Sequence, residues 1–169
     1  MKPFIREHHG VTPTIGEGSF VAETAALIGD VVIGKQSSIW YHCVLRGDGN
    51  YIRVGDRTNI QDGTIVHINS GDYPCIIGSD VSIGHAAIVH ACTLEDWAFV
   101  GMGATVLDGA VVESYGIVAA NALVAPGKVV KSRELWVGNP ARKLRDLTDR
   151  DFAMIEAVNK SYIESAATY

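Results

Sequence analysis

Three histidines in the middle of the chain are the residues best suited to chemistry. His67 follows Val66 and His90 follows Val89, two aliphatic residues that we expect to point inward, so both imidazoles should face outward. Three imidazoles and one water form the ligand set of a catalytic zinc site, in which the water occupies the position left open for reaction. The simpler alternative is that these are surface histidines with ordinary hydrogen bonds.

The third histidine, His85, is too close to His90 in the sequence to share a metal with it along a straight strand. Five residues of extended chain span about 16 Å, whereas a nitrogen–metal bond is only about 2.0–2.1 Å long. If chains pack side by side around a threefold axis, His85 of one chain can meet His90 of another, and such cyclic contacts close into a trimer. A sharp corner between the two residues would weaken this argument. His67 and His85 are 18 residues apart, the length of one full coil of a hexad solenoid, although the interruption at 69–74 blurs that register.

A period of six residues dominates the chain and predicts the fold that must position these histidines. Aliphatic residues followed by Gly or small polar residues indicate short strands that turn at regular corners, which is the hexapeptide signature of a β-helix. The pattern covers roughly residues 11–130 and predicts six or seven coils. A sandwich or barrel would alternate over four to eight residues instead. The inward positions are Val54, Ile60 and Val66; Ile77, Ile83 and Val89; and Leu94, Val100, Val106, Val112, Val118 and Val124.

The hexad repeat does not continue to the end of the chain, which predicts a division into a β-helix at residues 1–145 and a helix at residues 146–169. A Pro-containing turn and a basic strip at 135–145 end the repeats. Thr148 can cap a helix, with Asp149 and Asp151 favourably placed in its first turn. Apolar residues then recur at helical spacing up to Tyr162, so we expect a C-terminal helix of 15–18 residues along the solenoid.

Composition narrows the class of protein. The 169 residues carry a net charge of −5 with a pI near 5.6, which argues against a nucleic-acid partner. Three widely spaced cysteines, Cys43, Cys75 and Cys92, suggest reduced thiols in a cytoplasmic protein. The first residues lack the apolar stretch of a signal peptide, and no run of 18 apolar residues suggests a membrane span.

Several motifs together resemble the γ-class carbonic anhydrases and their bacterial homologues, nearly from end to end. The resemblance implies a left-handed parallel β-helix, followed by the helix, and a homotrimer with three sites between subunits. It also implies that His67 and His90 of one chain bind a metal with His85 of the next. The metal would be Zn²⁺, or another divalent ion such as Fe²⁺ or Co²⁺. The motifs are Leu45-Arg46-Gly47-Asp48, Thr58-Asn59-Ile60-Gln61-Asp62-Gly63, His67, Gly84-His85, His90, Val100-Gly101-Met102-Gly103-Ala104 and Val137-Gly138-Asn139-Pro140-Ala141.

The resemblance also assigns roles to the polar residues. Gln61 and Asn59 would orient the reacting water or the bicarbonate oxygens, and Tyr162 matches a tyrosine that reaches the site in relatives, although its spacing equally fits plain packing. An ion-pair network between subunits, which would position the ligand-bearing coils, is expected from Arg46, Asp48 and Asp62.

One departure concerns proton transfer. The archaeal prototype of the family has a glutamate where Gly49 stands and an acidic loop before the second histidine, both used for proton transfer. Here the loop at 69–74 is short and carries one acid, Asp72. The expected activity is therefore that of a lyase that reversibly hydrates carbon dioxide to bicarbonate, with a turnover that the missing acids would lower. The alternatives are an acyltransferase or thioesterase acting on acyl-CoA, or a metal-stapled trimer without catalysis.

Overall fold

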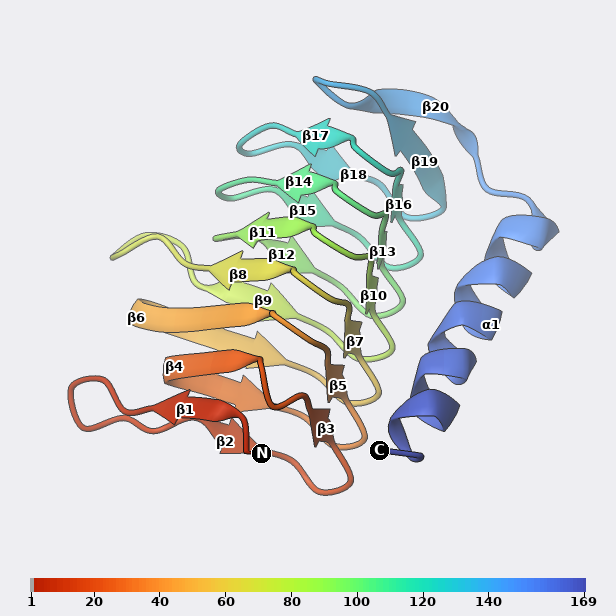
Figure 1. Ribbon diagram of the computed structural model, residues 1–169. Coiled ribbons are helices and arrows are strands. Elements are labelled where there is room, and N and C mark those ends of the chain that lie inside the picture. The colour runs from red at the N-terminus through yellow and green to blue at the C-terminus, as the bar shows by residue number, and fades with distance from the viewer. Residues whose placement is uncertain (1) are drawn as a thin grey trace.

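The computed structural model describes residues 2–169, which wind into a parallel β-solenoid of about seven turns with a helix along its side (Figure 1). The predicted β-helix and the helix after it are confirmed. The strands are β1 (Phe4–Arg6), β2 (Thr14–Ile15), β3 (Phe20–Val21), β4 (Ala26–Ile33), β5 (Ser38–Ile39), β6 (Val44–Val54), β7 (Asn59–Ile60), β8 (Ile65–His67), β9 (Cys75–Ile77), β10 (Ser82–Ile83), β11 (Ile88–His90), β12 (Thr93–Leu94), β13 (Phe99–Val100), β14 (Thr105–Val106), β15 (Val111–Val112), β16 (Ile117–Val118), β17 (Leu123–Val124), β18 (Val129–Val130), β19 (Glu134–Val137) and β20 (Arg142–Asp146); the helix is α1 (Asp149–Ala166).

The coils form three walls. In Figure 1 the chain runs leftward through the front strands β8, β11 and β14, then rightward through β9, β12 and β15 behind them, which is left-handed winding. The third wall contains β3, β5, β7, β10, β13 and β16. The long strand β6 passes round a corner and pairs with both β8 and β9, so the first two walls join into one twelve-stranded sheet.

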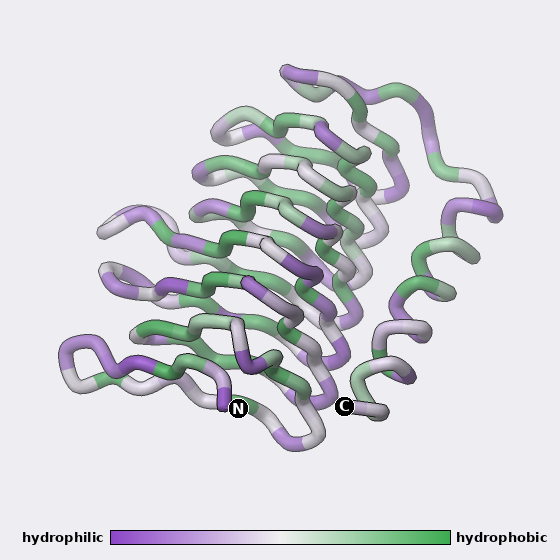
Figure 2. The backbone as a smooth tube through the Cα atoms, viewed as in Figure 1, coloured by the Kyte–Doolittle hydropathy of each residue, from purple (hydrophilic) through white to green (hydrophobic). Residues whose placement is uncertain are grey.

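The aliphatic residues of the hexads fill the interior. Val66, Ile83 and Val89 are completely buried, and each stacks on its counterpart in the next coil. Figure 2 shows hydrophobic stretches that recur in every coil. Because successive residues of a strand point to opposite sides, the residue after each inward one faces outward. This alternation is what sends the imidazoles of His67 and His90 to the surface, as predicted.

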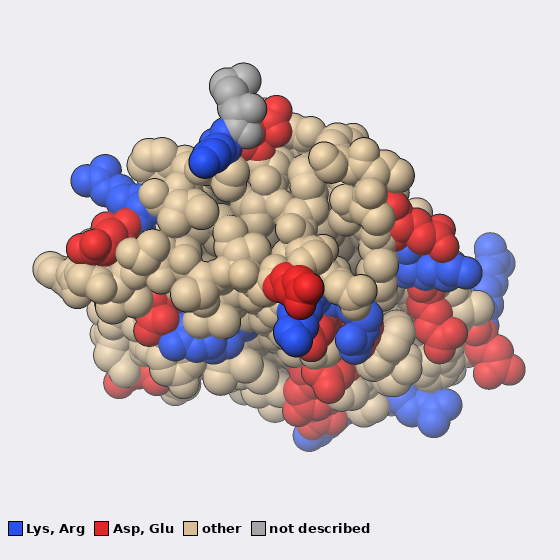
Figure 3. Space-filling model, turned by 90° about the horizontal axis from the view of Figure 1, so that it is seen from below, with Lys and Arg blue, Asp and Glu red and all other residues tan. Residues whose placement is uncertain are grey.

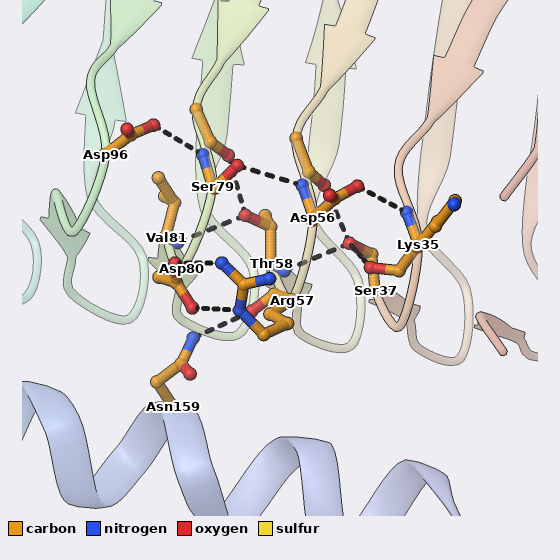
Figure 4. A network of polar contacts seen from close by, with 12 residues as sticks. Lys35, Ser37, Asp56, Arg57, Thr58, Ser79, Asp80, Val81, Asp96 and Asn159 are labelled. Atoms are coloured by element: carbon orange, nitrogen blue, oxygen red, sulfur yellow. Dashed lines mark hydrogen bonds and ion pairs between the residues drawn. The ribbon is translucent and has the colours of Figure 1, made fainter. Parts of the chain in front are cut away.

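The corner between the second and third walls carries a ladder of polar contacts that also fixes α1 (Figure 4). Arg57 donates two hydrogen bonds to the Asp80 carboxylate, from Nε at 2.8 Å and from Nη2 at 2.7 Å. Asn159, a buried residue of α1, donates to the Arg57 carbonyl at 2.8 Å. A buried amide that satisfies a backbone carbonyl fixes the rotation of the helix against the solenoid.

Aromatic rings hold the other end of the helix. Tyr169 lies 5.0 Å from Phe20 and 5.4 Å from Trp40, measured between ring centroids. Tyr162 of α1 contacts Trp40 edge to face, with centroids 5.5 Å apart. The helix therefore carries Tyr162 onto the third wall of the solenoid. None of the described helical structure is both long and apolar enough to cross a bilayer.

The end of the solenoid differs in detail from the sequence prediction. The sequence predicted a turn with a basic strip at residues 135–145. In the structure, β19 and β20 form an antiparallel hairpin there, which closes the third wall. Thr148 is the N-cap of α1 as predicted, and the Asp151 carboxylate accepts hydrogen bonds from both its backbone N–H and its hydroxyl. Viewed from the N-terminal end, the molecule shows clusters of charged residues of both signs, separated by uncharged surface (Figure 3).

Candidate metal centre

Two of the three predicted ligands lie one above the other on the first wall. His67 ends β8 and His90 ends β11, and the two residues are direct partners in the parallel sheet. Nδ1 of His67 is 3.2 Å from Nε2 of His90. Arg46, in the coil below, occupies the same position in the stack. The solenoid thus brings together two imidazoles that are 23 residues apart in the sequence.

Each of these imidazoles is also held by a carboxylate. Asp48 Oδ1 lies 3.1 Å from Nε2 of His67, and Asp108 Oδ1 lies 2.6 Å from Nδ1 of His90. A carboxylate accepts the N–H of the ring nitrogen that it contacts, so in neutral rings the two facing nitrogens carry lone pairs. Facing lone pairs at 3.2 Å repel each other unless a cation or an additional proton lies between them.

The separation of these nitrogens fits a tetrahedral metal. Two nitrogens bound to one zinc at about 2.0–2.1 Å lie about 3.3–3.4 Å apart when the angle at the metal is tetrahedral. The observed 3.2 Å is close to that value. His67 and His90 therefore suit a zinc-type ion both in donor chemistry and in spacing.

The third predicted ligand lies elsewhere. His85 follows β10 on the third wall, where its Nδ1 contacts Asp62 Oδ2 at 2.9 Å and its Nε2 lies 3.4 Å from the Tyr162 hydroxyl. The suggestion that the 18-residue step from His67 to His85 is one coil is wrong, because the register pairs His67 with His90. No group of three potential metal-ligating side chains occurs within residues 2–169 of one chain.

The two predicted amides lie beside His85. Asn59 is buried, and its Nδ2 donates to the Ser82 hydroxyl at 2.8 Å. Its Oδ1 accepts a hydrogen bond from Nε2 of Gln61 at 3.0 Å. The carbonyl oxygen of Gln61 is thereby the end of that amide available to a small polar ligand. Asn59 orients Gln61, and Gln61 lines the space next to His85.

Tyr162 closes the same space from the helix side. A pocket of about 340 Å³ lies between α1 and the third wall, lined by Tyr162, His85, Gln61 and mostly apolar or small side chains. Burial, together with the charge of Asp62, raises the pKa of the Tyr162 phenol, so its hydroxyl remains protonated near neutral pH. The tyrosine both packs on Trp40 and reaches His85, which combines the two roles considered from the sequence.

The carboxylates of the first wall are ionised. Burial acts to raise the pKa of Asp48, but hydrogen bonds from Arg46 and His67 outweigh it and hold the pKa below its usual value. The amide of Asn69 and then the imidazole of His90 lower the pKa of Asp108 in the same way. Two negative charges therefore stand directly behind the two imidazoles, which increases their basicity towards a cation.

Sequence reasoning missed Asp108. It lies 18 residues after His90 and one position past the stack, because the coil between β11 and β14 pairs Val89 with Val106. No spacing in the sequence singled it out. Of the residues predicted to form a network, Asp48 and Asp62 each contact a histidine, and Arg46 pairs with Asp48 within the chain. Each of the three predicted ligands thus has a carboxylate partner of its own.

Known proteins identify the family. No protein-family model matches the chain. Gamma carbonic anhydrase 2 of Arabidopsis thaliana, a mitochondrial protein, is 51% identical over 160 residues, which are 92% of this chain and 58% of that protein. A carbonic anhydrase of Geobacillus kaustophilus is 42% identical over 165 residues, 98% of this chain and 90% of the relative. The chain thus spans about three fifths of the plant relative.

A solved structure gives the same fold. A hexapeptide transferase family protein from Anaplasma phagocytophilum superposes with a TM-score of 0.95 at 46% identity, covering 100% of this chain and 99% of the other. The hexapeptide architecture is shared with transferases, so the relatives in sequence decide the family. With 42% identity over nine tenths of the Geobacillus carbonic anhydrase, the chain belongs to the γ-class carbonic anhydrase family.

Proposed function

We propose that this protein catalyses the reversible hydration of carbon dioxide to bicarbonate at a divalent metal, with zinc as the first choice. His67 and His90 of one subunit bind the metal together with His85 of a neighbouring subunit in a homotrimer. The observation that carries the proposal is the pairing of every predicted ligand with a carboxylate: Asp48 with His67, Asp62 with His85 and Asp108 with His90. Carboxylate–histidine pairs of this kind orient metal-binding imidazoles.

Exposed apolar residues beside the ligands support assembly. Ile65 and Ile88 point outward from the strands that end in His67 and His90, and they are 40% and 43% exposed. Met102, which lines the pocket of His85, is 58% exposed. Contiguous apolar side chains on a surface favour contact with another protein surface. Packing the first wall of one chain against the third wall of the next would cover both groups and bring His85 to the histidine pair.

The protein groups then have defined tasks. A divalent metal bound by three imidazoles lowers the pKa of a bound water to about 7, as in the zinc carbonic anhydrases, and so supplies hydroxide at neutral pH. The Gln61 carbonyl, oriented by Asn59, accepts a hydrogen bond from the reacting water, and its position beside His85 suits this task. The Tyr162 hydroxyl donates a hydrogen bond to an oxygen of bicarbonate. Arg46 contributes to the contact between subunits through its pair with Asp48.

The size of the pocket favours one alternative substrate class. Carbon dioxide needs only a small fraction of about 340 Å³. An apolar pocket of this size next to a metal-activated water could also admit the acyl group of a thioester, whose hydrolysis needs the same nucleophile. Acyl-CoA hydrolysis is therefore the second candidate.

Metal analysis tests the proposal first. Purified protein should hold about one divalent ion per chain, and His85→Ala or His90→Ala should abolish this content. His42→Ala is the matched control, since His42 is an exposed histidine outside the site. Hydration of carbon dioxide is then timed with the zinc, cobalt and iron forms, alongside acyl-CoA hydrolysis. Equal metal content in all variants would contradict the site, and activity on acyl-CoA alone would replace the first function by the second.

A further inference from the structure

Hydration of carbon dioxide releases one proton per turnover, and this proton must leave the site before the next cycle. Gly49, directly after Arg46-Gly47-Asp48, has no side chain that could accept this proton. A Cβ at Gly49 would lie 2.3 Å from the Ser70 hydroxyl oxygen, so a side chain there would require Ser70 to move. The proton therefore needs another acceptor.

A pocket on the other side of Asp48 contains two imidazoles. It encloses about 250 Å³ and is lined by His8, His9, Asp30, Asp48 and Asn50 among others. Asp48 is the residue whose Oδ1 contacts Nε2 of His67. Asp48 therefore both lines this pocket and hydrogen-bonds to a proposed metal ligand. Neither His8 nor His9 has a place in the metal centre itself.

The backbone explains why the first imidazole lies there. The N–H groups of His8 and Val11 each donate to the carbonyl of the other residue at 3.0 Å, which fixes the turn after β1. The turn rests on two stacked glycines of β4 and β6. A Cβ at Gly29 would lie 2.2 Å from the Gly47 carbonyl oxygen and 3.3 Å from Cβ of His8. Glycine at this position lets His8 approach the strand that carries Asp48.

The two imidazoles differ in burial, with one inside the pocket and the other at its surface. His8 is half-buried in the pocket, whereas His9 is exposed. Their ring centroids are 4.1 Å apart in an edge-to-face arrangement. Histidine is the side chain that ordinarily gains and loses a proton between pH 5 and 8. A half-buried imidazole in contact with an exposed one can therefore take a proton from the pocket and pass it to solvent.

We propose that His8 and His9 are the proton relay of this enzyme, an inference that rests on the proposed carbon dioxide hydration. The reaction converts carbon dioxide and water into bicarbonate and a proton. That proton moves through pocket water to an unprotonated ring nitrogen of His8, then by way of His9 to a buffer base, and the ring nitrogen is free again.

Charged residues surround the two imidazoles. Asp30 and Asp48 line the pocket, and Glu7 lies in the same turn, where its Oε1 accepts the N–H of Gly10 at 3.2 Å. Arg53 neutralises Asp30 through bonds of 2.7 and 3.2 Å from its guanidinium. Tyr51 also lines the pocket. Arg46 likewise pairs with Asp48, so each carboxylate that lines the pocket has an arginine partner.

The test uses the metal-loaded full-length chain with His8→Ala and His9→Ala together, and His42→Ala as the control. We expect the double variant to keep its metal and KM but to lose about tenfold or more of kcat in dilute buffer. Concentrated imidazole buffer should restore the parental kcat, because an external base then removes the proton. A parental kcat in dilute buffer, or a loss that buffer does not restore, would overturn the relay.

A second measurement does not depend on turnover. Ring NMR signals of His8 and His9, assigned from the single variants, should show at least His8 changing its charge between pH 5 and 8 in the folded chain. An imidazole that keeps one charge state over that range would exclude the relay. If the metal-loaded parent hydrates no carbon dioxide, the proposed function itself fails and the relay falls with it. An active parent with buffer-independent variants removes the relay alone.

Discussion

Mixing two inactive variants is the sharpest test of a metal site shared between chains. His85→Ala removes the ligand of the third wall, and His67→Ala removes a ligand of the first wall. Both side chains are partly exposed, at 44% and 21%, and neither belongs to the buried core. Truncation of such surface groups usually changes stability by less than about 0.5 kcal/mol, so both variants should fold and assemble.

The metal content expected of the mixed trimers follows from counting how often two suitable chains are neighbours. In a cyclic trimer each site takes His67 and His90 from one chain and His85 from the next. After random mixing in equal amounts, the first chain carries an intact His67 in half of the cases, and the next chain carries an intact His85 in half. About one quarter of the sites are then complete, so the metal content should rise from near zero to about 0.25 per chain.

The assay is metal analysis of trimers formed by co-expression or by refolding an equimolar mixture. Each variant alone, and the two mixed after folding without exchange of subunits, serve as controls. Mixed trimers that remain without metal would refute the claim that the ligands come from two chains. Metal retained by either single variant would show that the corresponding histidine is not a ligand.

Three further predictions follow from individual contacts. Asp108→Ala should weaken metal affinity about 10- to 100-fold, because the imidazole that it orients loses its partner; titration calorimetry with unchanged affinity would contradict this role. The pKa of Asp151 lies below 3.8 because Arg145 and then Thr148 hydrogen-bond its carboxylate. Its stabilisation is therefore complete above pH 3.8 and lost as the pH falls through the folded-state value; Asp151→Ala should cost about 1 kcal/mol in urea unfolding at pH 7 and flatten the acid limb. Burial raises the pKa of Cys43 to about 11, so iodoacetamide at pH 8 should modify this thiol only in denaturant.

The fold could be read from the sequence because its signal is local and repeated. Each hexad places one aliphatic residue inward, and the pattern continues through Val124 without needing any distant contact to interpret it. The hairpin of β19 and β20 was not predicted, because it lacks such a local, repeated signal. Its strands pair across a Pro-containing turn, and β20 is exposed throughout, so it has no apolar period to reveal it.

The site could be predicted only in part from the sequence, because the lengths of the loops decide which strands stack on one another. Counting 18 residues paired His67 with His85, but the insertion at 69–74 lengthens that coil, so that His90 stacks on His67 after 23 residues. The coil above the insertion is one residue shorter than the later ones, since Val89 pairs with Val106 whereas Leu94 pairs with Val112. Asp108 therefore lies one position past the stack and still reaches His90. An insertion has no hexad of its own, and only the structure shows which later strand resumes the stack.

The geometry of the solenoid explains why such a centre calls for a second chain. Outward residues of neighbouring coils are about 4.8 Å apart, so one wall can present two imidazoles whose nitrogens approach to 3.2 Å. A third imidazole in the same stack would start about 10 Å from the first and would approach along the same line. Tetrahedral coordination requires the third ligand to come from a different direction. A residue at a corner, such as His85, points away from its own first wall but can face the first wall of a neighbour.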